Sequence, residues 1–421
     1  MSLQGPVVVV AKEPAPELMA ALSAAGASPI IEASDGELGT AIDAAEPAAV
    51  VLADPQSPAD PQVIAVLSQV IAGAKAYVPV IACIAHEAVP PLPVAIPVFL
   101  AAATDRLVAR LRAALRVRTL HISVLQRIEG LRSQGVDVPP LPLNDPIEDA
   151  TVIVAGRGGS YPALTVAIGE RVGLIGALSL ETARGFIRAR DVDGIVIGDG
   201  FNRRVVADFL AEIATDPQLR DMPVAVVDDV GGEIDPERLP NLERVAANPA
   251  LIADQVLPIV RLHAFSARLR RMALTLDAKG MIDPNTGLRT DDAFRDDLIR
   301  AVDEAERRGV GLSLARFSLE NLADRRISID AARIVARLVR AADFACRDAD
   351  GTILVAFAAT DLRTVHVVAR RIASVLKHTT LAPGRDRNAL DPTVTIAAWR
   401  SRDTAETLIA RVARENMVAA S

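Results

Sequence analysis

Short runs of consecutive apolar residues alternate with helical stretches along the first two thirds of the chain, and this alternation limits the possible folds most. In the first block the runs are PVVVVA (6–11), AAVVLAD (48–54), VPVIACI (78–84) and IPVFLA (96–101). Such runs are typical of strands buried on both faces, and strands alternating with helices favour a parallel sheet with right-handed crossovers. Residues 104–133 carry Leu and Val at helical spacing, which predicts one long helix.

The second block repeats this plan. Its strand runs are ATVIVAG (150–156), DGIVIGD (193–199) and MPVAVVDD (222–229), and a helix over 250–280 closes it. A proline-rich linker at 138–146 separates the two blocks. The central run follows the first run at nearly the same distance in both blocks, which indicates duplication at the scale of a domain.

The last third of the chain has a different order of elements. Strands are predicted at 311–319 and 392–399, a hairpin at 344–357, and helices at 329–341, 360–377 and 403–418. This order predicts an α+β domain with a mixed or antiparallel sheet. A chain of 421 residues is long enough for two to four domains. We therefore predict three domains, at 1–137, 138–280 and 281–421.

Composition excludes several classes of function. The net charge of -7 and the pI of about 5.4 argue against broad binding to nucleic acid or to an anionic membrane. The two cysteines, Cys83 and Cys346, have no paired spacing, which indicates a reducing compartment and excludes a cysteine-based zinc site. Neither a signal peptide nor an apolar run of about 18 residues is present, so we expect no membrane insertion and a cytoplasmic protein.

The first block carries the D-x-x-x-P pattern in Asp54 and Pro58, directly after its central strand run. On this pattern it resembles response-regulator receiver domains, which implies a flavodoxin-like, doubly wound fold with Asp54 as a possible phosphoacceptor. The acidic pair that holds Mg²⁺ in that family is replaced here by Ala11 and Lys12. Two interpretations stay open: Asp54 receives a phosphoryl group or another signal, or it only ends a strand and pairs with Lys12.

The second block resembles a receiver domain that has lost more of the pattern. Ala155 and Gly156 stand at the acidic positions, and Gly198 stands at the acceptor position with Asp199 one residue later. The resemblance implies an adaptor or dimerisation module. The glycine-rich GRGGS (156–160) matches no known phosphate-binding loop, which makes a phosphate cradle a minor alternative.

The third block begins with DPNTGLRTDDAF and contains ADFACRDADGTILVAF in its hairpin. On these two segments it resembles the GGDEF (diguanylate cyclase) family over about 281–419, and the whole chain resembles PleD-like receiver–receiver–GGDEF response regulators. Cyclases join two GTP molecules with the help of metal ions. At the two positions where the family places metal-binding carboxylates, this chain has Arg316 and Gly351. We therefore expect no cyclase activity.

One feature of the family is retained. Its product-inhibition site is an R-x-x-D tetrapeptide five residues before the signature, and Arg340–Asp343 has this spacing from Ala349. An arginine fork matches guanine O6 and N7, and a carboxylate accepts from guanine N–H groups. The family adds an arginine from the next helix, where this chain has Arg370 and Arg371.

The tetrapeptide by itself is weak evidence. Other pairs fit it as well, among them Arg188–Asp191, Arg300–Asp303, Arg347–Asp350 and Arg400–Asp403. A local salt bridge worth a few tenths of a kcal/mol is the simpler interpretation of Arg340 and Asp343.

The resemblance implies a non-enzymatic effector that binds cyclic di-GMP as a ligand and uses no cofactor. It further implies a homodimer through the receiver blocks, and protein partners in a proteolysis or polar-localisation pathway of the cell cycle. A scaffold that binds no nucleotide is the alternative, and an active cyclase is the remaining one.

Overall fold

The computed structural model describes residues 4–54, 61–85, 87–99, 104–133, 138, 141, 150–216, 219–227, 235, 238–277, 281–308, 311–319, 325–340, 342–377 and 392–418. The chain divides into two compact units. The first holds Met1–Gly185 with Val192–Arg270, and the second holds Phe186–Asp191 with Arg271–Ser421. The junctions predicted at 137–138 and 280–281 each include a residue outside the described part.

The first block forms a five-stranded parallel sheet in the order β2-β1-β3-β4-β5. The strands are β1 (Gln4–Val10), β2 (Ser28–Ala33), β3 (Ala49–Leu52), β4 (Val80–Ile84) and β5 (Ile96–Phe99), and the helices are α1 (Pro16–Ala24), α2 (Leu38–Ala45), α3 (Pro61–Gly73) and α4 (Thr104–Ser133). Val8 and Val10 of β1 pack with α2 and α3, whereas Val7 and Val9 pack with α1 and α4. This sheet is therefore covered on both faces, and its strand order is the flavodoxin-like one.

The second block forms another parallel sheet, in the order β10-β9-β8-β6-β7. Its strands are β6 (Thr151–Ala155), β7 (Gly173–Ala177), β8 (Gly194–Ile197), β9 (Val224–Val227) and β10 (Leu242–Val245), and its helices are α5 (Tyr161–Gly169), α6 (Leu180–Ala189), α7 (Arg203–Thr215) and α8 (Pro249–Asp277). Counted from β6, the order is again 2-1-3-4-5. The predicted α/β class with two parallel sheets is confirmed. The assignment of both sheets to receiver domains stays a prediction.

Three observed strands are missing from the sequence predictions. They are β2, β7 and β10, which lie at sheet edges within segments that we expected to be helical or left unassigned. The long helix predicted at 104–133 is confirmed with the same bounds as α4.

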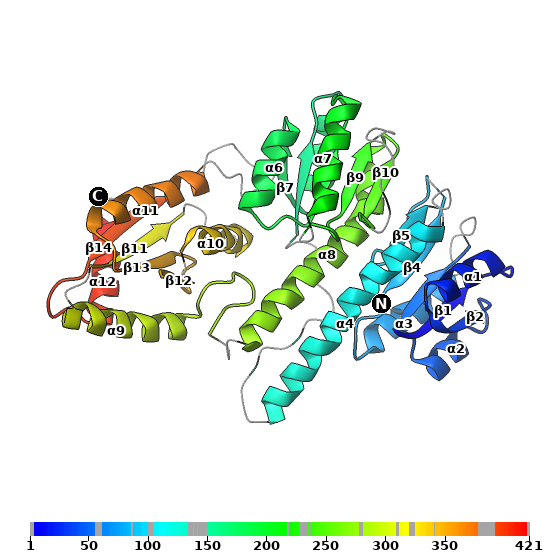
Figure 1. Cartoon of the computed structure of the whole chain (residues 1–421), viewed down its shortest axis with the longest axis horizontal. Helices are drawn as coiled ribbons and strands as arrows, with labels where there is room; N and C mark the ends of the chain where they lie inside the picture. Colours follow the sequence, from blue (N-terminus) through cyan, green and yellow to red (C-terminus); the bar gives the residue numbers. More distant parts are fainter. Residues whose placement is uncertain are drawn as a thin grey trace. The chain divides into compact units, whose positions relative to one another are not determined.

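The long helices α4 and α8 lie side by side (Figure 1), and their apolar residues share one core cluster, to which Leu111 and Phe265 belong. The segment Pro249–Leu276 is long and apolar enough to cross a membrane by length and composition. However, 67% of its most apolar window is buried. It is a core helix of the first unit, and the described residues contain no clear membrane span.

A buried ion pair joins the two blocks within the first unit. Arg110 of α4 is fully buried and pairs with Glu243 of β10, which is 1% exposed. The Arg110 Nε also donates to the Pro240 carbonyl at 3.1 Å. Nearby, Arg106 donates to the Leu242 carbonyl at 3.0 Å. Helix α4 packs in the core of its own block and is thus also bonded to the edge strand β10 of the next block and to Pro240 beside it.

The second unit contains a four-stranded antiparallel sheet in the order β12-β13-β11-β14. The strands are β11 (Leu312–Ser318), β12 (Phe344–Arg347), β13 (Ile353–Ala358) and β14 (Thr393–Ala398), and the helices are α9 (Asp291–Arg308), α10 (Arg325–Leu338), α11 (Leu362–Lys377) and α12 (Ala405–Val418). The predicted hairpin and antiparallel sheet are confirmed. Helix α10 ends earlier than the predicted 341, so Arg340 follows the helix instead of belonging to it.

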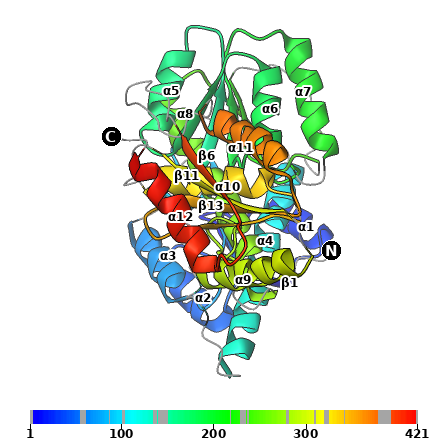
Figure 2. The same cartoon turned by 90° about the vertical axis from the view of Figure 1, so that its left-hand side faces the viewer.

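Helices cover both faces of this sheet (Figure 2). The side chains of α10 and α11 form one core cluster with Phe317 and Val355, and those of α9 and α12 form another with Leu314 and Leu354. Strand β12 is the edge strand, and it contacts both α9 and α10. The edge of the sheet at β12 therefore lies between two helices that belong to different layers.

Candidate ligand-binding site

A pocket of about 680 Å³ lies along the edge strand β12 in the second unit. Its walls come from three segments: α9, the end of α10 with the turn that follows, and the loop before α9. Both Arg340 and Asp343 line it, as do three further arginines, Arg289, Arg300 and Arg307. This volume is within the usual range for small-molecule sites.

The turn between α10 and β12 positions Arg340 and Asp343. It is closed by a hydrogen bond from the Asp343 backbone N–H to the Arg340 carbonyl at 2.9 Å. The side chains pair through Arg340 Nε and Asp343 Oδ2 at 2.7 Å. The Asp343 side chain is only 3% exposed, whereas that of Arg340 is 54% exposed. The buried Asp343 carboxylate thus holds the guanidinium of an arginine whose side chain is about half exposed.

Further hydrogen bonds orient the same pair. Asp343 Oδ1 accepts from the Ala358 N–H at 3.1 Å, at the end of the neighbouring strand β13. Arg340 Nη2 donates to the Ala358 carbonyl at 3.1 Å and to the Thr360 hydroxyl. The Arg340 Nη1 group makes no hydrogen bond to the residues that the structure describes. The local salt bridge expected from the sequence is therefore present, and it leaves one donor group of the fork available.

Helix α9 supplies the wall with most charge. Arg300 donates to Asp297 one turn earlier, and Arg307 pairs with Glu304 at 3.1 Å. Arg289, from the loop before α9, also reaches Asp297 at 3.1 Å. The pocket therefore presents arginines beside carboxylates on more than one wall. From the sequence alone, Arg300–Asp303 is only one of several chance matches to R-x-x-D, and the α9 wall was not predicted.

Arg370 and Arg371 are placed differently. Both are exposed on α11, and neither is among the described residues that line the pocket. The structure thus brings Arg340 and Asp343 together but does not add the α11 arginines to their pocket.

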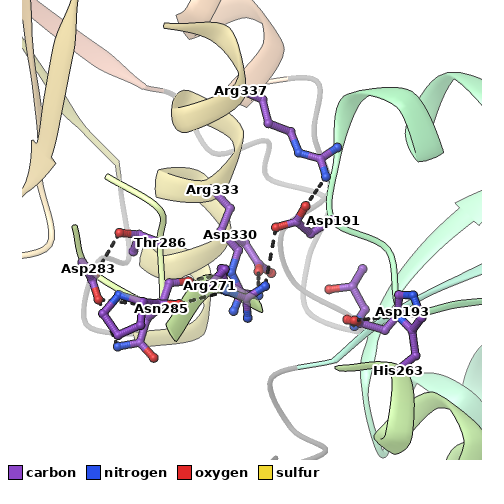
Figure 3. Close-up of polar contacts among 12 residues, drawn as sticks. Asp191, Asp193, His263, Arg271, Asp283, Asn285, Thr286, Asp330, Arg333 and Arg337 are labelled. Atoms are coloured by element: carbon purple, nitrogen blue, oxygen red, sulfur yellow. Dashed lines mark hydrogen bonds and ion pairs between the residues drawn. The ribbon is translucent and has the colours of Figure 1, made fainter. Parts of the chain in front are cut away.

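The loop before α9 contains the sequence DPNTG at 283–287 (Figure 3). Asp283 accepts hydrogen bonds from the Asn285 N–H at 3.0 Å and from the Thr286 hydroxyl at 2.7 Å. Arg271 and Arg333 donate to the Pro284 and Asn285 carbonyls at 2.9 and 2.8 Å. The motif is therefore a rigid turn that holds one wall of the pocket, because both carboxylate oxygens of Asp283 accept hydrogen bonds from within the turn.

Two arginines, Arg271 and Arg337, also contact the short segment Phe186–Asp191 of this unit. Asp191 pairs with Arg337 of α10 and lies 3.9 Å from Arg271 (Figure 3). Asp191 belongs to one of the other R-x-x-D matches, and this pairing gives it a structural role.

The hairpin between β12 and β13 contains the five positions that align with the GGDEF signature, 349–353. Arg316 of β11 pairs with Asp350 at 2.8 Å, and Thr352 donates to Asp350 through its N–H and its hydroxyl at 2.9 and 2.6 Å. Burial raises the pKa of the Asp350 carboxyl, but these hydrogen bonds and Arg316 outweigh it, so the pKa lies below its usual range. The described part of the chain contains no group of three or more His, Cys, Asp or Glu side chains placed to hold a metal ion.

In the first block, Asp54 follows β3 and lies 4.0 Å from the Lys12 amine (Oδ2 to Nζ). The pairing expected from the sequence is present. Pro58, the second residue of the D-x-x-x-P pattern, lies outside the described residues.

In the second block, the Asp199 carboxylate occupies the turn made by GRGGS. Its Oδ1 accepts from the Ser160 N–H at 3.3 Å and from the Ser160 hydroxyl. A Cβ on Gly158 would lie 2.1 Å from this carboxylate, so the glycine is required for close packing. An internal carboxylate thus takes the place that a phosphate would need, which argues against the phosphate-cradle alternative.

Comparison with known proteins gives matches only among solved structures. No model of a known protein family matches the sequence, and no curated protein matches it. Several of the structures matched are GGDEF domains. The coiled coil and GGDEF domain of DgcB from Caulobacter crescentus in complex with c-di-GMP is 19% identical, with 35% of this chain and 84% of that chain covered and a TM-score of 0.31.

Two further matches come from Pseudomonas aeruginosa. The diguanylate cyclase SiaD in complex with its activator SiaC is 19% identical over 34% of this chain and 60% of that chain, with a TM-score of 0.31. The FimX GGDEF domain is 16% identical over 32% of this chain and 90% of that chain, with a TM-score of 0.29. Similarity at this level establishes neither an activity nor a ligand for this chain.

Proposed function

We propose that this chain is a non-enzymatic effector that binds cyclic di-GMP in the pocket lined by Arg340 and Asp343. The observation that carries the proposal is that these two residues, singled out by their spacing from the degenerate signature, line a pocket of about 680 Å³. The exposed Arg340 fork suits guanine O6 and N7. The Asp343 carboxylate, which is bonded to Arg340 and 3% exposed, can accept from guanine N–H groups only once that bond is released.

Binding requires a local rearrangement of this pair. The Nε and Nη2 groups of Arg340 are bonded to Asp343, Ala358 and Thr360, and only Nη1 makes no bond to described residues. A bidentate contact with guanine needs two adjacent donors, so Arg340 must release one of these bonds when the ligand enters. An arginine that is 54% exposed can turn without disturbing the core.

The loss of catalysis is the second part of the proposal. Phosphoryl transfer between nucleotides depends on metal ions that neutralise charge at the reacting phosphates. The positions that align with the metal-binding carboxylates are Arg316 and Gly351. A guanidinium repels a divalent cation, and Arg316 is already paired with Asp350. Incubation with GTP and Mg²⁺ should give no cyclic product, and robust turnover would contradict the proposal.

On the family resemblance, the chain is similar in type to PopA, a degenerate member of the PleD-like group. That type implies a homodimer through the receiver blocks and a cytoplasmic protein recruited to the cell pole. Its partners would belong to a proteolysis pathway of the cell cycle. Arg370 and Arg371 on α11 would then contribute from outside the pocket, for example to a second ligand molecule.

Titration calorimetry with cyclic di-GMP on the wild type and on Arg340→Ala tests the proposal. Micromolar binding in the wild type that is lost in Arg340→Ala supports it. Absence of heat in both proteins favours the alternative of a scaffold that binds no nucleotide.

A further inference from the structure

Two R-x-x-D pairs that are distant in the sequence line the same pocket. Arg340 and Asp343 come from the turn after α10, and Arg300 and Asp303 come from α9. These helices cover different faces of the sheet, so the pairs reach the edge strand β12 from its two sides. The chain contains seven R-x-x-D matches, and among the described residues only these two line the pocket with both their arginine and their aspartate.

The α9 pair has the geometry and the free groups that a ligand needs. Residues three apart in a helix lie on one face. Arg300 is 67% exposed and donates only to Asp297, which Arg289 also contacts at 3.1 Å. The Asp303 carboxylate accepts no hydrogen bond within the described part of the chain. Asp297 is therefore engaged by two arginines, whereas Asp303 can accept new donors.

Three of the remaining matches have a carboxylate that is bonded inside the protein. Asp403 pairs with Arg411 at 2.7 Å, and Asp350 pairs with Arg316 at 2.8 Å. Asp191 pairs with Arg337. Each of these carboxylates has a structural partner, which separates them from Asp303.

We infer that Arg300 and Asp303 form a second guanine-reading set, so that the pocket reads both bases of one cyclic dinucleotide, one at each pair. This inference rests on the proposed function. One arginine and one carboxylate are the side chains that match the acceptor edge and the donor edge of a guanine. Cyclic di-GMP carries two guanines, and a pocket with two such sets on different walls matches that number.

The inference predicts a specific ligand preference. The wild type should bind cyclic di-GMP about 10- to 100-fold more tightly than the mixed cyclic GMP–AMP dinucleotide, because an adenine leaves one set without its partner. In Arg300→Ala and in Asp303→Asn the two ligands should bind with similar affinity, because only the Arg340 set still reads a guanine. Arg300→Lys keeps the charge but not the fork, and should lose the preference as well.

Titration calorimetry with both dinucleotides on the full chain tests this. Asp296→Asn and Arg400→Ala are matched controls, because both residues are exposed and lie outside the pocket, and both variants should keep the wild-type preference. If Arg300→Ala and Asp303→Asn keep the full preference while Arg340→Ala binds nothing, the second set is wrong and the proposed function stands. If the wild type binds neither ligand, both proposals fail.

Discussion

Single side chains decide what the hairpin at 349–353 can do. Asp350 is the only carboxylate at these five positions, and it is bound by Thr352 and Arg316. Arg316 therefore neutralises the one acidic side chain of this hairpin. On the proposed function, this ion pair stands where a cyclase would hold a metal ion.

The Asp350 carboxyl should make the second unit sensitive to acid. Its pKa is lowered in the folded state, so its contribution to stability is present above the unfolded pKa of about 3.9. That contribution is lost as the pH falls through the lower folded value. Trp399, the only tryptophan, lies in this unit, so its fluorescence during urea unfolding at a series of pH values reports the effect.

Asp350→Asn is the comparison for this measurement. It should be less stable than the wild type at neutral pH and should lose less stability below about pH 4. If both proteins show the same dependence on pH, the Arg316–Asp350 pair contributes nothing to folding. The effect should be small, because the Asp350 side chain is 53% exposed.

At the scale of elements, the sequence predicted the central strands and missed the three edge strands β2, β7 and β10. The predicted strands β1, β3 and β4 are continuous apolar runs because both faces are covered by helices. Strand β2 is mostly exposed or half-buried, and β10 contains Glu243 and Arg244. Neither segment forms a continuous apolar run. In β2 several positions are exposed, and in β10 the charged Glu243 bonds to Arg110 of α4.

The residues of the candidate site could likewise be predicted only in part. Spacing from the signature was enough to single out Arg340 and Asp343, since the turn after α10 is local in sequence. The α9 wall could not be found, because its charged residues resemble a solvated helix face until the fold brings β12 against it. Arg370 and Arg371 were predicted from a family position, and the structure leaves them outside the pocket.

Two glycines in different elements should respond oppositely to substitution by alanine. Gly351 has φ of +84°, where an L side chain costs about 1–2 kcal/mol, so Gly351→Ala should destabilise the second unit by that amount. Gly185 lies within α6 with nothing within 4 Å of an added Cβ. Gly185→Ala should therefore stabilise the chain by about 0.5–1 kcal/mol.

Urea unfolding followed by Trp399 fluorescence measures the first variant, and circular dichroism measures the second. A Gly351→Ala protein as stable as the wild type would show that the hairpin turn can relax away from its left-handed conformation.

At the scale of the whole molecule, the two parallel sheets belong to one compact unit because α4 and α8 pack together and Arg110 pairs with Glu243. The first two blocks are therefore packed against each other within this unit. Removing one partner of a buried ion pair costs about 3–5 kcal/mol, because the other charge is left unpaired.

Arg110→Met should accordingly destabilise the first unit by about 3–5 kcal/mol in urea unfolding followed by circular dichroism. The double variant Arg110→Met/Glu243→Leu should recover most of this loss, because no buried charge remains. Trp399 fluorescence should show an unchanged transition for the second unit. A single variant within about 0.5 kcal/mol of the wild type would show that the ion pair does not hold the blocks together.

The central claim is that the chain has kept a nucleotide-binding pocket while losing the chemistry of a cyclase. Calorimetric titration of cyclic di-GMP into the wild type, Arg340→Ala and Arg400→Ala, side by side, tests it most directly. Both arginines begin an R-x-x-D tetrapeptide, but only Arg340 lines the pocket. We predict micromolar binding by the wild type and Arg400→Ala and none by Arg340→Ala. Equal binding by all three proteins, or no binding by the wild type, would contradict the claim.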